Sequence, residues 1–399
     1  MIGCPGTTTY LQGQLAERIP AKITQYGWEV VYGSVVWKID PGKEDTTYGN
    51  AWFVAKKDSV DFEDGTSRPA YIVAIAATSG VYDWVYEDLA IGNVVDLDSW
   101  ARQGDIGLSK MPTPIPNNAS APKDAALVSL GFTRGVYQIL NNVPLEGSPG
   151  YPHTLPQFIK SLQATPSRPS PKLIIAGHSL GGALSPALAY ILLKTDSLGI
   201  FSNNTYVYPT AGPTPGNRVF AQNFKALFPP HTNPPASSYK HWNVNIINRL
   251  DIVPCAYCTD PKYKPEVLPS IVRMYNGKND MKYIPIVALA IYPLKSMSNK
   301  LYVPIDLKPF ESPIPKPSIA PRRFREFLDV AHKQHVRAYS LEILKVDIPE
   351  PECPKSEVDD WKAHPVLGHI VQTKIQVEGN IGTLFEEATF ELPEWAIAN

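Results

Sequence analysis

Short apolar runs alternate with longer amphipathic segments along this chain. Stretches rich in valine and aromatic residues at 27–39 and 51–55 are typical of strands, and we expect them to pair antiparallel. Three mostly apolar runs, at 71–77, 173–176 and 244–247, are expected of parallel strands that are covered on both faces. The pattern therefore predicts antiparallel strands early in the chain and parallel strands after them.

Helical patterns lie between the apolar runs, at 125–140, 155–163 and 183–194. Strand and helix in alternation predict an α/β fold with a mostly parallel, doubly wound sheet. A further stripe of apolar residues, in 324–344, has helical spacing. The chain shows no internal repeat.

The length of 399 residues would allow two or three domains, yet α/β folds of this size are commonly one domain with insertions. We place one catalytic domain at 1–345 and a C-terminal addition, packed on the same domain, at 346–399. In that addition 369–377 and 389–392 suggest a pair of strands. Residues 262–320 are expected to form an insertion of mixed apolar and proline-rich character.

The segment 92–122 lacks periodicity and contains the proline-rich run 111–116. Structureless segments of this length are usually lids or disordered loops. We expect a surface loop that lies over the active edge of the sheet and acts as a lid.

Composition narrows the function classes. The chain is 44% hydrophobic and 19% charged with a formal net charge of −1, so it can bury a large core and has no electrostatic signature for nucleic acid. Residues 1–20 lack a basic start followed by an apolar core, so we expect no classical signal peptide and either a cytoplasmic location or export by another route. The apolar stretch 283–294 is too short to span a bilayer and is interpreted as a core segment or as an apolar rim for transient lipid contact.

Cysteine is sparse, and the pair Cys255-x-x-Cys258 is compatible with a local disulfide, a redox pair or half a zinc site. No second C-x-x-C exists to complete a zinc site, so we expect reduced or structural cysteines. The chemistry of the candidate residues described next requires neither a metal nor an organic cofactor.

The hexapeptide 177–182, Gly-His-Ser-Leu-Gly-Gly, follows an apolar strand run and precedes a helical run. A serine at a sharp strand-to-helix turn needs small neighbours two positions before and two after it, and Gly177 and Gly181 supply them. The dipole of the helix that follows favours negative charge near the serine oxygen. Ser179 is therefore the candidate nucleophile.

A serine nucleophile needs a histidine to accept its proton and a carboxylate to orient that histidine. Asp251 follows the run 244–247, where a strand meets a loop at the carboxyl edge of the sheet. His335 lies at the centre of the apolar stripe in 324–344 and is the candidate base. His369, in an expected loop after Pro365 and Gly368, is the alternative histidine.

The oxyanion of a tetrahedral intermediate needs two donors, one of which is normally the backbone N–H of the residue after the nucleophile. That residue is Leu180. Thr78, directly after the run 71–77, can offer its backbone N–H and its hydroxyl as the second donor.

These motifs, in this order, resemble the class 3 lipases, the fungal-lipase-like family of the α/β-hydrolase superfamily. The residues that carry the resemblance are Thr78-Ser79, Asp83-Trp84, Glu87-Asp88-Leu89, Val128-x-x-Gly131-Phe132, Gly177 to Gly182, Pro213-x-x-Gly216-Asn217-x-x-Phe220-Ala221, Asn248-x-x-Asp251-x-Val253-Pro254 and Gln334-His335 with Tyr339. Two positions depart from the family pattern: Ala76-Ala77 replaces an Arg-Gly pair, and Ser129 replaces a histidine. The segment 92–122 does not resemble the short lid helix of the fungal enzymes, so interfacial activation is not implied.

The resemblance and the candidate triad predict a carboxylic ester hydrolase that acts through an acyl-enzyme, with triacylglycerol as the favoured substrate. Phospholipids, aromatic esters and acyl transfer to an alcohol also suit the triad. The alternative from another class is a catalytically silent lipase-like binding protein. The sequence does not indicate an oligomeric state.

Overall fold

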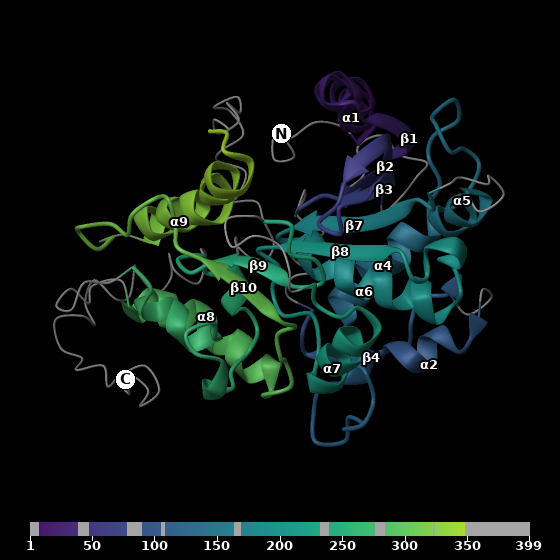
Figure 1. Cartoon of the computed structure of the whole chain (residues 1–399). Coiled ribbons are helices and arrows are strands. Elements are labelled where there is room, and N and C mark those ends of the chain that lie inside the picture. The colour runs from purple at the N-terminus through teal and green to yellow at the C-terminus, as the bar shows by residue number, and fades with distance from the viewer. Residues whose placement is uncertain are drawn as a thin grey trace, which may run out of the picture. The chain divides into compact units, whose positions relative to one another are not determined.

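A seven-stranded sheet of order β1-β2-β3-β7-β8-β9-β10 organises the fold (Figure 1). Its strands are β1 (Glu29–Lys38), β2 (Tyr48–Asp61), β3 (Ser67–Ile75), β7 (Lys172–His178), β8 (Thr205–Thr210), β9 (Asn245–Asn248) and β10 (Leu307–Phe310). The first three pair antiparallel, and β3, β7, β8, β9 and β10 run parallel. The predicted α/β class, with early antiparallel strands and a mostly parallel sheet, is confirmed.

The computed structural model describes residues 8–38, 48–77, 90–104, 108–162, 169–231, 239–275, 284–321 and 324–347. All of these residues belong to one compact unit, Thr7–Ile348. The C-terminal addition beyond residue 347, with its predicted strand pair and its packing, lies outside the described residues. No helix among the described residues is long and apolar enough to span a membrane.

Helices lie on both faces of the sheet, and α6 and α1 lie on opposite sides of it in Figure 1. They are α1 (Thr8–Ile23), α2 (Leu97–Ala101), α4 (Leu130–Asn141), α5 (Leu155–Leu162), α6 (Leu180–Lys194), α7 (Arg218–Leu227), α8 (Ile284–Ser298) and α9 (Phe324–His332). Alternation along β7 sends Ile175 into the large core with α4 and α6, whereas Ile174 packs with Tyr206 and Trp242 on the other face. The parallel strands are therefore covered on both sides.

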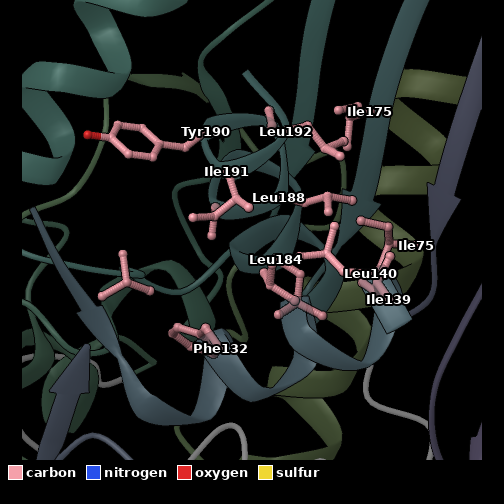
Figure 2. Packing of buried hydrophobic residues seen from close by; sticks show 14 of the residues in the cluster. Ile75, Phe132, Ile139, Leu140, Ile175, Leu184, Leu188, Tyr190, Ile191 and Leu192 are labelled. Carbon is pink, nitrogen blue, oxygen red and sulfur yellow. The ribbon is translucent and has the colours of Figure 1, made fainter. Parts of the chain in front are cut away.

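The helix α6 is the centre of the large core. Every residue from Leu180 to Leu192 is buried, as expected of a helix that is apolar on all sides. Figure 2 shows Leu184 and Leu188 of α6 beside Phe132 and Ile139 of α4. Burial of one such leucine contributes about 1.5–3 kcal/mol. This packing fixes the start of α6, which carries the site described below.

The predicted surface loop at 92–122 is wrong for much of its length. Residues 93–96 form β4, which pairs with β5 (Ile115–Pro116) and β6 (Leu127–Ser129) in a second, three-stranded sheet. Leu97 and Trp100 of α2 lie in the large core and are at most 2% exposed. Residues 93–101 are anchored by these contacts and therefore do not form a surface loop. A lid role for the rest of the segment stays a prediction.

Two further boundaries differ from the sequence prediction. The helix expected at 125–140 begins only at Leu130, because Ser129 ends β6 and caps the helix. The expected insertion 262–320 contributes β10 to the main sheet, parallel to β9, and includes α8. In α8, Val287 and Ile291 are buried, which supports a core interpretation of the apolar stretch 283–294, although Tyr292 is exposed.

Candidate active site

Ser179 lies at the turn between β7 and α6, and its backbone has a positive φ, with φ 59° and ψ −122°. Such a backbone is strained for a residue with a side chain and is found mainly at functional sites. The turn is held from both sides, because Ser179 N–H donates to the Thr210 carbonyl at 3.0 Å and Gly182 N–H donates to the Ser179 carbonyl at 2.8 Å. The neighbouring strand and the helix thus over-determine the serine conformation.

The flanking glycines are required by close backbone approach. A Cβ on Gly181 would lie 2.5 Å from the Ile75 carbonyl oxygen and 2.8 Å from that of Ala76, and a Cβ on Gly177 would overlap the backbone of Gly181. Backbone atoms of β3 and α6 cannot move aside cheaply. Small residues at these two positions, inferred from the motif alone, therefore have a steric cause in the fold.

His335 lies where the helical segment 324–344 changes register. The chain continues from α9 into π-helical turns at Lys333–Arg337 and Ser340–Leu344. The Nε2 atom of His335 is 2.8 Å from Ser179 Oγ, and Nδ1 is 2.8 Å from Asp251 Oδ2. The histidine side chain is 15% exposed, so one edge of the ring can meet solvent or a ligand.

Asp251 lies in the turn after β9, and its side chain is fully buried. Its carboxylate accepts hydrogen bonds from Val253 N–H at 3.0 Å and from the Tyr339 hydroxyl at 2.8 Å, in addition to the contact with His335. Three donors offset the loss of hydration that a buried carboxylate suffers. The structure therefore brings the predicted Ser179, His335 and Asp251 into one hydrogen-bonded chain.

A second polar network holds the histidine segment against the sheet. Asn248 Nδ2 donates to the carbonyl of Gln334 at 2.8 Å and to its Oε1 at 2.9 Å. Gln334 in turn donates to the Ile314 carbonyl and accepts from Ser312. These contacts fix the residue directly before His335. The motif match drew attention to Asn248 and Gln334, but their direct pairing could not be read from the sequence because 86 residues separate them.

The predicted helical stripe was partly wrong. Phe327, Ala331 and Ala338 are buried as expected, whereas Leu328 is exposed. Beyond residue 332 the constant rotation of about 100° per residue also fails, because a π-helical turn rotates less per residue about the helix axis than an α-helical turn does. His335 nevertheless faces inward, as predicted.

His178 lies beside the candidate base and was not assigned a role from the sequence. Its ring centroid is 4.8 Å from that of His335, and its Nδ1 is 3.0 Å from Thr210 Oγ1. Burial, together with the neighbouring His335, lowers the pKa of His178 to about 3. His178 is therefore a neutral ring against His335 at ordinary pH.

The two candidate oxyanion donors and the alternative histidine have different outcomes. Leu180 is the first residue of α6, where backbone N–H groups lack acceptors within the helix. Thr78 and His369 lie outside the described residues. Upstream of Thr78, the Ala76 N–H donates to the Ala51 carbonyl at 2.8 Å, which anchors the end of β3 without the Arg-Gly pair of the family.

The other departure from the family pattern also has a structural use. Ser129, which replaces a histidine, accepts a hydrogen bond from Phe132 N–H at 3.1 Å and so caps α4.

Cys255 and Cys258 are both buried free thiols, and burial raises the pKa of each. Within the described ranges, no group of three or more His, Cys, Asp or Glu side chains could hold a metal ion.

A serine at a strand-to-helix turn, facing a histidine and a buried aspartate at the carboxyl edge of a mostly parallel sheet, is the arrangement of an α/β-hydrolase. The crystal structure of M37 lipase matches this fold over 86% of this chain and 90% of that chain, with a TM-score of 0.58 and 23% sequence identity.

Sequence comparison adds a family match over part of the chain. Residues 95–259 match the family described as lipase (class 3), which confirms the resemblance predicted from the motifs and supports a lipase-type ester hydrolase. A structure of Rhizomucor miehei lipase with its propeptide matches over 62% of this chain and 59% of that chain, at 18% identity and a TM-score of 0.36. A structure of Yarrowia lipolytica Lip2 lipase matches over 58% of this chain and 61% of that chain, at 21% identity and a TM-score of 0.33. No curated protein matches the sequence.

Proposed function

We propose that this protein hydrolyses carboxylic esters of lipids through an acyl-enzyme formed on Ser179, with triacylglycerol as the favoured substrate. The observation that carries the proposal is the pair of 2.8 Å contacts that His335 makes, one to Ser179 Oγ and one to Asp251 Oδ2. This is the geometry in which a histidine can take the serine proton while a carboxylate fixes its tautomer. The class 3 lipase match over 95–259 supports the choice of lipid esters.

The proposed reaction assigns a residue to each step. Ser179 Oγ attacks the ester carbonyl as its proton passes to His335 Nε2, and the imidazolium then gives that proton to the departing alcohol. Water then attacks the acyl-enzyme as its proton passes to the same nitrogen, and the imidazolium returns that proton to Ser179 Oγ as the acid leaves. Asp251 stabilises the imidazolium in both half-reactions.

The negative charge of each tetrahedral intermediate needs donors near the serine. We assign one to the Leu180 N–H, since Leu180 begins α6 and the helix dipole would add to its effect. We assign the second to Thr78, and the Thr78→Ala variant should lose about 10²-fold or more in kcat.

The first test is hydrolysis of p-nitrophenyl esters from acetate to palmitate and of emulsified triacylglycerol. Ser179→Ala should lose all measurable turnover while keeping its fold, and Ser185→Ala is the matched control. Ser185 is a fully buried serine of the same helix that takes no part in the site. A phosphonate serine trap adds a readout that does not depend on substrate, because it should label the wild type and leave Ser179→Ala unlabelled.

The outcomes separate the alternatives. A chain-length profile with a preference for long acyl groups supports a lipase, and a preference for acetate indicates an esterase. Labelling without turnover points to a narrower substrate such as a phospholipid. Neither labelling nor turnover overturns the proposal and favours a silent lipase-like binding protein.

The histidine assignment has its own test. His335→Ala should lose about as much activity as Ser179→Ala, because members of a triad act as a unit. His332→Ala, at an exposed position one turn earlier, should keep normal activity. If His369→Ala is the inactive variant instead, the assignment of His335 is wrong.

A further inference from the structure

Tyr339 is a buried tyrosine whose hydroxyl lies between the sheet and the candidate triad. It accepts a hydrogen bond from Asn248 N–H at 2.8 Å and donates one to Asp251 Oδ2 at 2.8 Å. Tyr339 is 4% exposed, and its ring packs edge-on against the rings of Phe310 and His178, with centroid distances of 5.2 Å and 5.0 Å. Its position is therefore set by packing as well as by hydrogen bonds.

The direction of the hydrogen bond follows from the donors available. A tyrosine hydroxyl has one hydrogen, and Asn248 N–H already occupies an acceptor site on its oxygen. The hydrogen of Tyr339 must therefore point to Asp251. Burial raises the pKa of Tyr339 well above its ordinary value, so the hydroxyl stays protonated and remains a donor at working pH.

The same carboxylate oxygen serves two donors. Asp251 Oδ2 contacts both His335 Nδ1 and the Tyr339 hydroxyl, while Val253 N–H binds Oδ1. A hydrogen bond from a neutral donor stabilises the ionised carboxylate and reduces the basicity that it confers on the histidine. The tyrosine thus acts on the same carboxylate oxygen that the histidine contacts.

We propose that Tyr339 is a positioning residue of the hydrolase, whose hydroxyl orients Asp251 toward His335 and sets the pH dependence of the reaction. The proposal rests on the proposed function, since it concerns the same site. Tyr339 acts through Asp251, and its hydroxyl has no contact with Ser179 among the described hydrogen bonds.

The test is the pH profile of kcat/KM for full-length Tyr339→Phe, which keeps the ring and removes the hydroxyl. Without the donor, the ionised carboxylate of Asp251 loses one stabilising hydrogen bond, so the acid limb of the profile should move up by about one pH unit. The activity on that limb should fall about tenfold and recover toward the alkaline plateau. A merely structural role would lower the rate equally at all pH values, and an unshifted profile overturns the proposal.

Tyr239→Phe is the matched control. Tyr239 also donates its hydroxyl to a carboxylate, that of Glu342, and also packs edge-on against Phe310. It does not contact the triad in the described structure, so its acid limb should coincide with that of the wild type. A shift of equal size in Tyr239→Phe would also overturn the proposal, because a general change in the helical segment would then explain both.

A second measurement covers failure of Tyr339→Phe to fold. Incorporation of 3,5-difluorotyrosine at position 339 keeps the hydroxyl and makes it a stronger donor, so the acid limb should move down instead of up. The pH dependence of phosphonate labelling of Ser179 gives the same readout without a substrate. If the wild type is neither active nor labelled, the proposed function itself has failed. If the enzyme is active but its acid limb does not change with the residue at position 339, only the role of Tyr339 has failed.

Discussion

His178 makes a specific prediction about stability at acidic pH. The pKa of this histidine is lowered to about 3 in the folded protein, chiefly by burial, whereas an unfolded histidine titrates near 6.5. Below pH 6.5 the unfolded chain therefore binds a proton that the folded protein does not bind. The stability associated with His178 is fully present above pH 6.5 and is lost as the pH falls toward about 3.

The size of the effect follows from the same pKa values. Each pH unit below 6.5 costs about 1.4 kcal/mol of unfolding free energy from this one group. Between pH 6.5 and pH 4.5 the loss reaches at most about 2.7 kcal/mol, which is a large fraction of the 5–15 kcal/mol typical of a whole domain. His178→Phe should remove this loss while keeping a ring in contact with His335.

The assay is urea unfolding of the wild type and His178→Phe at pH values from 7 to 4.5. The difference in unfolding free energy between the two proteins should change by about 2–3 kcal/mol over this range, in favour of the variant at acidic pH. His332→Phe, an exposed position, serves as the control and should show no such change. Parallel curves for wild type and His178→Phe would refute the buried neutral histidine.

The remaining predictions concern the elbow and the small sheet. Gly181→Ala should unfold the elbow or abolish turnover, because the added Cβ would lie 2.5 Å from the Ile75 carbonyl oxygen. Gly13→Ala in α1 should instead raise stability by about 0.5–1 kcal/mol, because its Cβ would meet nothing within 4 Å. Thermal unfolding of the two variants measures this contrast, and an active Gly181→Ala enzyme would contradict it. Trp100→Ala should cost about 3–5 kcal/mol of stability, because Trp100 is 2% exposed in the core. A loss below about 1 kcal/mol would restore the surface-loop interpretation of 92–122.

Several features of the site could be predicted because their signals are local. A serine between a strand run and a helical run, with Gly177 and Gly181 around it, is a pattern contained in six residues. Asp251 was found by its place after an apolar run, and His335 by its place in a helical stripe. The structure brings these three side chains together, while their catalytic roles remain proposals.

Features that depend on contacts between distant segments were missed. The π-helical turns within 333–344 break the constant helical step, and Leu328 of α9 is exposed against the predicted stripe. The pairing of Asn248 with Gln334 joins segments 86 residues apart. The proline-rich run 111–116 and the lack of periodicity predict a loop over 92–122, although Trp100 packs in the large core. A propensity pattern reports what one segment prefers, whereas these features arise from what it meets.

The sequence by itself determined the fold class, the family resemblance and the nucleophile turn, because strand and helix periodicity and the need for small residues at a tight turn are properties of neighbouring residues. Only the tertiary structure decided that β10 completes the sheet beside β9, that residues 93–101 belong to the core, and that the Tyr339 hydroxyl reaches the carboxylate of Asp251. Each of these depends on the closure of long loops, whose outcome is set by the packing of the whole core and not by any local preference.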